Sequence, residues 1–286
     1  VARQLVREGI RVVMGSRDPV KGERACAGLA AGELAVSHPL DVNDTRSVQR
    51  FVEFVDKEFG APAILVNNAG TYPESTEARV VDVKTSVWRE TLETNLLGAV
   101  RLCREVVPLM QRVAYGRVVN ISSGLGQLSQ MGAGSPAYRV SKAALNAFTA
   151  TLAAEVKEAG ILVNSMSPGW VRTDMGGPGG KITPAESVRA LRSLIDAIRL
   201  EDSGKFFNYD GKPVTAADLK AVGPMMVLLN EAVLPNLVQT TEGAPAIIHC
   251  GPFANIAHGT SSVLAQRIGL HLADWVVNET GFAADL

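Results

Sequence analysis

Short apolar runs alternate with helix-length segments along residues 1–214, and this alternation constrains the fold more than any other feature. It predicts βαβ units and a parallel sheet. We expect a doubly wound α/β fold, in which ligands bind at the carboxyl ends of the strands. Strands are predicted at residues 10–15, 34–36, 63–67, 116–121, 161–167 and 205–207, and helices at residues 1–9, from 16, at 44–59, at about 84–112, around Tyr138 and at 184–199.

The bulk composition predicts a globular protein with a large core, because 47% of the 286 residues are hydrophobic. No apolar run approaches the length of about 18 residues that a membrane span needs, and the first residues have neither the apolar core of a signal peptide nor an initiating Met. The net charge of -1 argues against a nucleic-acid or membrane partner. Cys26, Cys103 and Cys250 are too far apart for a disulfide framework or a zinc site, so we expect reduced thiols and a cytoplasmic protein.

Tyr138 and Lys142 open a long predicted helix that follows a loop rich in Gly and Ser. Side chains four residues apart lie on one helix face, one turn from each other. A phenol with its ordinary pKa near 10 exchanges protons poorly at neutral pH, and a neighbouring ammonium favours the phenolate. The two residues are therefore a candidate acid–base pair, with a solvated helix face as the alternative if the spacing is taken alone.

Small and amide-bearing residues follow three of the predicted strands. They occur at 67–70 (Asn-Asn-Ala-Gly), at 120–124 (Asn-Ile-Ser-Ser-Gly) and at 164–169 (Asn-Ser-Met-Ser-Pro-Gly). Such residues let a flat ligand approach the backbone and form hydrogen bonds. Each alone is ordinary turn chemistry, but parallel strands bring all three to one edge of the sheet, so we expect a cleft there beside Tyr138.

With these motifs in place, residues 1–214 resemble the short-chain dehydrogenase/reductase family, which has a Rossmann-like fold. The resemblance rests on Asp41-Val42, on residues 67–70, on Asn95, on residues 120–123, on Tyr138-x-x-x-Lys142 and on residues 168–173. It implies that Tyr138 is the general acid/base and that Lys142 lowers its pKa and holds the nicotinamide ribose. It further implies that Ser123 orients the substrate oxygen and that Asn95 positions a water in a proton relay.

The same resemblance implies where a nicotinamide dinucleotide binds. The adenine is assigned to Asp41 and Val42, and the adenosine side to Asn67, Ala69 and Gly70. The nicotinamide side is assigned to the stretch after the strand predicted at 161–167, where Val171 and Thr173 hold the carboxamide. Tyr138 and Lys142 also contact the cofactor. Within the stretch at 168–173, the residues assigned to the cofactor are Pro168, Gly169, Val171 and Thr173.

Arg17 and Lys21 favour NADP(H) over NAD(H) as the cofactor. An NAD-binding protein of this fold has an acidic residue after its second strand to hold the ribose 2′-OH. Here Arg17 takes that place and Lys21 follows one helical turn on, and two cations suit a 2′-phosphate. The alternative interpretation is a pair of surface charges at the start of a helix.

The expected first strand and Gly-rich turn of such a fold do not precede the helix that ends at Gly9. Backbone N–H groups of that turn bind the pyrophosphate. We therefore expect residue 1 to be an internal position of a longer enzyme whose sheet lacks a central strand. We also expect the chain as given to bind NADPH weakly or not at all.

Residues 215–286 resemble an internal stretch of formate–tetrahydrofolate ligase, most specifically at residues 235–259. We expect a helix at 217–233, a strand at 246–249, a loop at 251–259, a helix at 262–272 and a strand at 274–278. That ligase uses ATP, yet the chain contains no G-x-x-x-x-G-K-[S/T] phosphate loop. His249 and His258 have no third ligand spaced with them, which argues against a metal site. This part is therefore expected to be a fragment without catalytic groups.

The leading hypothesis is an NADP(H)-dependent oxidoreductase that interconverts a small-molecule carbonyl and a secondary alcohol. One rival is an ATP-dependent formyl transfer by the ligase-like part. The other is an inactive chimera of two fragments. The sequence leaves the substrate and the oligomeric state open.

Overall fold

The computed structural model describes residues 1–29, 32–210, 236–239, 245–248 and 271. The chain divides into two compact units, residues 1–214 and residues 215–286. Within the described ranges, no helix is long and apolar enough to cross a lipid bilayer. No group of three or more His, Cys, Asp and Glu side chains in those ranges could hold a metal ion.

Helices and strands alternate through the first unit, as the sequence predicts. Its six strands are β1 (Val12–Ser16), β2 (Ala35–Pro39), β3 (Ile64–Asn67), β4 (Gly116–Ile121), β5 (Ile161–Met166) and β6 (Phe206–Phe207). Its α-helices are α1 (Ala2–Arg7), α2 (Pro19–Ala27), α3 (Thr45–Phe59), α4 (Thr85–Leu92), α5 (Gly98–Arg112), α6 (Pro136–Val156) and α7 (Pro184–Ala197). Shorter helices are η1 (Gly32–Leu34), η2 (Glu93–Leu97), η3 (Gly124–Gly126), η4 (Leu128–Gln130), η5 (Lys157–Ala159) and η6 (Leu200–Asp202).

The strands of this unit form two parallel sheets. β3, β4, β5 and β6 are neighbours in that order, whereas β1 and β2 pair only with each other. In the described part of the chain, no strand pairs with the second edge of β1 or of β3. Both strands therefore have one row of backbone N–H and C=O groups without a partner strand.

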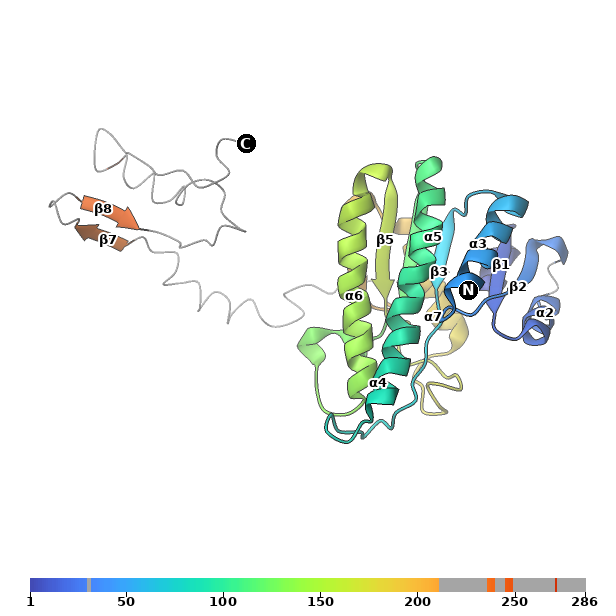
Figure 1. Ribbon diagram of the computed structural model, residues 1–286, viewed down its shortest axis with the longest axis horizontal. Coiled ribbons are helices and arrows are strands. Elements are labelled where there is room, and N and C mark those ends of the chain that lie inside the picture. The colour runs from blue at the N-terminus through green and yellow to red at the C-terminus, as the bar shows by residue number, and fades with distance from the viewer. Residues whose placement is uncertain (30–31, 211–235, 240–244, 249–270, 272–286) are drawn as a thin grey trace. The chain divides into compact units, whose positions relative to one another are not determined.

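Side chains of β4 and β5 alternate between two hydrophobic cores. Val118 and Val163 belong to one core, which α3, α5 and α6 share, while Val119 and Leu162 belong to the other, which α7 covers. Successive side chains of a strand point to opposite faces, so each strand serves both cores. Figure 1 shows α5 and α6 in front of these strands and α7 behind them. This is the doubly wound arrangement that the sequence predicts.

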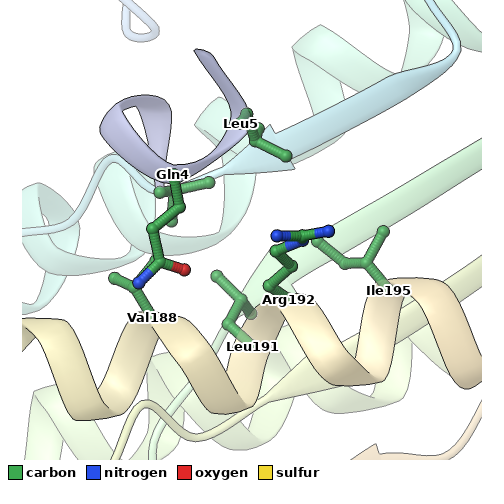
Figure 2. Close-up of a pocket in the computed structure, with 7 residues that line it drawn as sticks. Gln4, Leu5, Val188, Leu191, Arg192 and Ile195 are labelled. Atoms are coloured by element: carbon green, nitrogen blue, oxygen red, sulfur yellow. The ribbon is translucent and has the colours of Figure 1, made fainter. Parts of the chain in front are cut away.

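Helix α1 packs against α7 on the second face. Figure 2 shows the small hollow between them, lined by Gln4 and Leu5 on one side and by Leu191 and Ile195 on the other. Arg192 of α7 forms an ion pair with Glu8, just after α1. None of the residues that line this hollow comes from α6 or from the carboxyl ends of the strands.

The helix predicted at about 84–112 is present but is not regular. A π-helical segment, η2, joins α4 to α5, and it contains Asn95. The side chain of Asn95 hydrogen-bonds to the backbone of Thr71 and to Ser141 on α6. Single π turns within helices are frequent at functional sites, where they re-aim a side chain. Residue periodicity does not predict this interruption, because the partners of Asn95 are distant in sequence.

In the second unit the structure describes one antiparallel pair of strands, β7 (Asn236–Gln239) and β8 (Pro245–Ile248). Val238 lies opposite Ala246 in this pair. The strand predicted at 246–249 corresponds to β8, whereas β7 was not predicted. The other elements expected in this unit lie outside the described residues: those at 217–233, 251–259 and 274–278, and almost all of the helix at 262–272. His249 and His258 lie outside them as well.

Candidate functional site

The carboxyl ends of β3, β4 and β5 lie side by side. Asn67 of β3 pairs with Asn120 of β4, and Ile121 of β4 pairs with Met166 of β5. Consequently the three stretches of small and amide-bearing residues begin at one edge of the sheet. Helix α6 packs on β5 and carries Tyr138 and Lys142 at its start. This edge and the first turns of α6 form the candidate site.

Lys142 is buried beside Tyr138. Only 4% of the lysine is exposed, and its Nζ lies 5.7 Å from the centroid of the Tyr138 ring. The ammonium donates a hydrogen bond to the carbonyl oxygen of Ile121, 2.8 Å away. Burial lowers the pKa of Lys142 to about 8, because an apolar environment penalises the charged form.

Burial shifts the pKa of Tyr138 in the opposite direction. Desolvation raises the pKa of the phenol above its ordinary value, a hydrogen bond with the Ser123 side chain lowers it, and Tyr72 raises it further. The phenol therefore keeps its proton at neutral pH in this state of the protein. Such a group can donate a proton to a ligand oxygen, provided that a positive charge stabilises the phenolate left behind.

Ser123 is the member of the serine pair that faces Tyr138. It is the second residue after β4, and its hydroxyl also accepts a hydrogen bond from the backbone N–H of Leu125, 3.1 Å away. Ser122 is only 2% exposed, and its hydroxyl donates to the carbonyl oxygen of Lys142 instead. Strand alternation turns the two hydroxyls in opposite directions.

Asn95 and Gly70 lie next to the lysine. Asn95 is 1% exposed, and its amide accepts from the N–H of Thr71 (2.7 Å) and donates to the hydroxyl of Ser141 (2.9 Å). A Cβ atom on Gly70 would lie 3.4 Å from Asn95 Oδ1 and 3.7 Å from Lys142 Nζ. Glycine at this position therefore leaves open the space between the strand end and these two polar groups.

Two predicted cofactor residues, Asn67 of the adenosine side and Val42 of the adenine site, point into the core. Asn67 is 6% exposed, and its Nδ2 donates to Asn120 Oδ1 at 2.7 Å and to Cys103 Sγ at 3.4 Å. Val42 is 7% exposed and packs against Gly98. Ala69 and Gly70, by contrast, are exposed at the strand end. A ligand can thus reach the latter part of the motif, at Ala69 and Gly70.

Arg17 and Asp41 follow the paired ends of β1 and β2, where Ser16 lies opposite Pro39. Arg17 is exposed, as is Lys21 in the first turn of α2. Asp41 is half-buried, and its carboxylate accepts from the N–H of Asn43 at 3.0 Å. In the described ranges neither Arg17 nor Lys21 forms an ion pair, so both cations are available to an anionic ligand.

The stretch after β5 folds back onto β4. The hydroxyl of Ser167 accepts from the N–H groups of Gly124 (3.0 Å) and Gly169 (3.3 Å). Gly169 has a φ of 78°, which other residues rarely adopt. Three further residues of the stretch were predicted. The carbonyl oxygen of Pro168 accepts a hydrogen bond from Ser187, and Val171 forms a β-bridge with Ile182. The hydroxyl of Thr173 accepts a hydrogen bond from the N–H of Gly176.

Two residues of the loop after β3 also border the site and were not predicted. The ring of Tyr72 lies 4.9 Å from that of Tyr138, and the carboxylate of Glu74 accepts hydrogen bonds from the start of α6. No specificity element is recognisable in the sequence of this loop. Its partners on α6 are more than 60 residues away, so no local spacing could have indicated them.

Two family models match the chain. The model described as short chain dehydrogenase matches residues 1–181, and the model described as formate–tetrahydrofolate ligase matches residues 183–286. The second match begins ahead of residue 215, where the sequence resemblance was placed. It therefore includes α7 and β6, which pack within the first structural unit.

Among solved structures, the carbonyl reductase Sniffer of D. melanogaster superposes with a TM-score of 0.67 and 26% sequence identity. That match covers 72% of this chain and 88% of the reductase. An NADPH-bound carbonyl reductase from chicken fatty liver gives a TM-score of 0.64 and 26% identity, and covers 72% of this chain and 87% of that one.

Curated proteins that are similar in sequence include formate–tetrahydrofolate ligases. The ligase of Roseiflexus castenholzii is 56% identical over 110 residues, which are 37% of this chain and 20% of that protein. The ligase of Methylorubrum populi is 68% identical over 129 residues, which are 43% of this chain and 22% of that protein. The chain thus matches about a fifth of the length of these relatives.

Proposed function

The chain belongs to the short-chain dehydrogenase family, with residues 1–181 matching the family model, and from this we propose that it is an NADP(H)-dependent oxidoreductase that interconverts a carbonyl and a secondary alcohol. The observation that carries the proposal is the buried ammonium of Lys142 over the ring of Tyr138, whose phenol is hydrogen-bonded to Ser123. The similar fold of two carbonyl reductases supports the same reaction class.

The residues at the site fit a nicotinamide cofactor. The strand end at Ala69 and Gly70 is exposed, and the missing Cβ of Gly70 leaves room beside Asn95 and Lys142. When bound, such a cofactor supplies or accepts a hydride at the carbon of the substrate. The chain's own residues must then supply or accept a proton at the substrate oxygen.

In the direction of reduction, the hydroxyl of Tyr138 gives its proton to the carbonyl oxygen as that oxygen takes the electron pair of the C=O bond. The hydroxyl of Ser123 donates a hydrogen bond to the same oxygen and orients it. Lys142 stabilises the phenolate that remains on Tyr138, because opposite charges interact strongly where water is excluded. In oxidation the phenolate takes the proton back.

Arg17 and Lys21 support NADP(H) as the cofactor. Both cations are exposed at the ends of β1 and the adjoining helix, where a 2′-phosphate would meet them. The carbonyl reductase from chicken fatty liver is described as NADPH-bound, which agrees with this preference.

The test is turnover of a panel of aldehydes and ketones by the full chain at millimolar NADPH or NADH. Tyr138→Phe should lower kcat/KM by about 10²–10⁴-fold, the usual contribution of general acid/base catalysis, and change the Kd for NADPH only a few-fold. Tyr115→Phe is the matched control, since Tyr115 precedes β4 at the opposite edge of the sheet. A loss under about tenfold in Tyr138→Phe would remove that residue from the role.

The alternative function is ATP-dependent formyl transfer, favoured by the sequence identity of residues 183–286 to the ligases. The absence of a G-x-x-x-x-G-K-[S/T] loop from the sequence opposes it. Thermal shift separates the two proposals, because a ligand that binds only the native state raises its stability. Stabilisation by ATP with formate, and not by NADPH, would favour the ligase.

A further inference from the structure

Helix α6 begins in an unusual way. Ser135, the residue before its first turn, adopts left-handed backbone angles (φ 53°, ψ 45°) and its side chain does not cap the helix. Pro136 follows and has no N–H group. The first N–H groups of a helix have no partner within the helix, so those of Ala137 and Tyr138 must be satisfied from elsewhere.

Glu74 satisfies both of these N–H groups from a different part of the fold. Its Oε2 accepts from the N–H of Ala137 at 3.2 Å, and its Oε1 accepts from the N–H of Tyr138 at 2.6 Å. A carboxylate at a helix N-terminus is also favoured by the helix dipole. Charge-assisted bonds are stronger than neutral ones, and two of them fix the orientation of the helix turn.

The loop that carries Glu74 is joined to the start of α6 at two further points. The hydroxyls of Tyr72 and Ser135 are hydrogen-bonded to each other at 2.5 Å. The backbone of Gly134 packs against the carbonyl of Thr76 so closely that a Cβ there would lie 2.2 Å from the oxygen. The part of the loop from Tyr72 to Thr76 is therefore held against the start of α6.

The same loop leads back to the other polar groups of the site. It begins at Thr71, whose N–H and C=O both bond to the side chain of Asn95. Tyr72 then lies against the ring of Tyr138, with 4.9 Å between the ring centroids. One short segment thus connects Asn95 to the backbone and to the ring of Tyr138.

We propose that Glu74 is a positioning residue that caps helix α6 from the loop after β3 and thereby holds Tyr138 in register with Ser123. The proposal rests on the proposed function, in which Tyr138 exchanges a proton with the substrate. Glu74 does not touch the reacting atoms. It acts through the backbone of Tyr138, and a displacement of about 1 Å at a reacting group can cost about 10²-fold in rate.

Three variants test the proposal. Glu74→Ala removes both acceptors, Glu74→Gln keeps one acceptor oxygen without the charge, and Glu77→Ala changes an exposed glutamate of the same loop. We expect kcat to fall about 10–100-fold in Glu74→Ala, to be partly restored in Glu74→Gln and to be unchanged in Glu77→Ala, with the KM for NADPH within about twofold throughout. A kcat for Glu74→Ala within about twofold of wild type overturns the proposal.

Hydrogen exchange at the start of α6 gives a readout that does not need activity. Amides that lose a hydrogen-bond partner exchange faster. The amides of Ala137 and Tyr138 should therefore exchange about tenfold faster in Glu74→Ala than in wild type, and the increase should be smaller in Glu74→Gln. Unchanged exchange in Glu74→Gln would overturn the capping role even if Glu74→Ala failed to fold. If wild type showed no turnover, the proposed function would fall, and faster exchange would still support the cap.

Discussion

The ammonium of Lys142 donates a hydrogen bond to the carbonyl oxygen of Ile121, 2.8 Å away, and so joins the second turn of α6 to the last residue of β4. Among the residues that the structure describes, no carboxylate forms an ion pair with this lysine. Burial removes water from the ammonium and so disfavours its charged form, which is why the pKa of Lys142 falls to about 8.

The first prediction is that the stability of the protein depends on pH through Lys142. Its pKa is about 8 in the native state and 10.5 ordinarily, so between these values the unfolded chain binds more protons and the free energy of unfolding rises with pH. The rise is at most about 1.4 kcal/mol per pH unit. Burial raises the pKa of Tyr138, so the folded protein does not release the proton of this phenol ahead of the unfolded chain.

Urea unfolding of wild type and Lys142→Met at about pH 7.5 and about pH 9.5 measures this effect. The free energy of unfolding of wild type, relative to that of Lys142→Met, should be about 1–2 kcal/mol larger at the higher pH than at the lower pH. Lys157→Met, which removes an exposed lysine near the end of the same helix, is the control. A difference that does not change with pH would mean that Lys142 is not desolvated.

The second prediction concerns the buried hydrogen bonds between β4 and α6. The hydroxyl of Thr149 accepts from Asn120 Nδ2 at 2.8 Å and donates to the carbonyl of Leu145 at 2.7 Å. Thr149→Val leaves the amide of Asn120 without this partner and should lower the free energy of unfolding by about 1–3 kcal/mol. Thr151→Val, on the exposed side of the same helix, should change it by less than about 0.5 kcal/mol. Equal effects of the two substitutions would contradict the prediction.

The third prediction is a change of cofactor preference in Arg17→Asp. The substitution removes a cation that is available to a 2′-phosphate and adds an acid that suits a ribose 2′-OH. The ratio of kcat/KM for NADPH to that for NADH should fall by the equivalent of about 1–3 kcal/mol, the contribution of one charge-assisted bond. Arg24→Asp, in the last turn of α2, should leave the ratio unchanged. An unchanged ratio in Arg17→Asp would count against NADP(H).

The fourth prediction is that Cys103 does not react with thiol reagents while the protein is folded. Cys103 is 2% exposed, and burial raises the pKa of its thiol to about 12, which leaves almost no nucleophilic thiolate at neutral pH. In a Cys250→Ser background, Cys26, which is only partly buried, should be labelled in native buffer. Cys103 should be labelled only after addition of denaturant, and rapid labelling of Cys103 in native protein would contradict its position in the core.

Local sequence signals located most of the helices and strands of the first unit. Asp44 and Gly60 illustrate how: the carboxylate of Asp44 caps α3, and Gly60 ends that helix with a φ of 79°. Both are interactions with residues a few positions away, so the sequence contains them directly. The spacing of Tyr138 and Lys142 is likewise a property of one helix.

Contacts between distant segments were not predicted from the same signals. β7 is a short strand whose partner β8 is required to identify it. The π turn at Asn95 depends on Thr71 and Ser141, which are 24 and 46 residues away. The inward direction of Asn67 depends on Asn120 and Cys103 in neighbouring elements.

The sequence by itself therefore determined the order of helices and strands, the sheet edge at which the site forms and the residues that could exchange a proton there. These follow from periodicity, capping and turn chemistry, which act over a few residues. Only the tertiary structure decided how Tyr138 is held, because its backbone N–H bonds to Glu74, 64 residues earlier in the chain. Such a bond exists only after the sheet has placed the loop after β3 beside the start of α6.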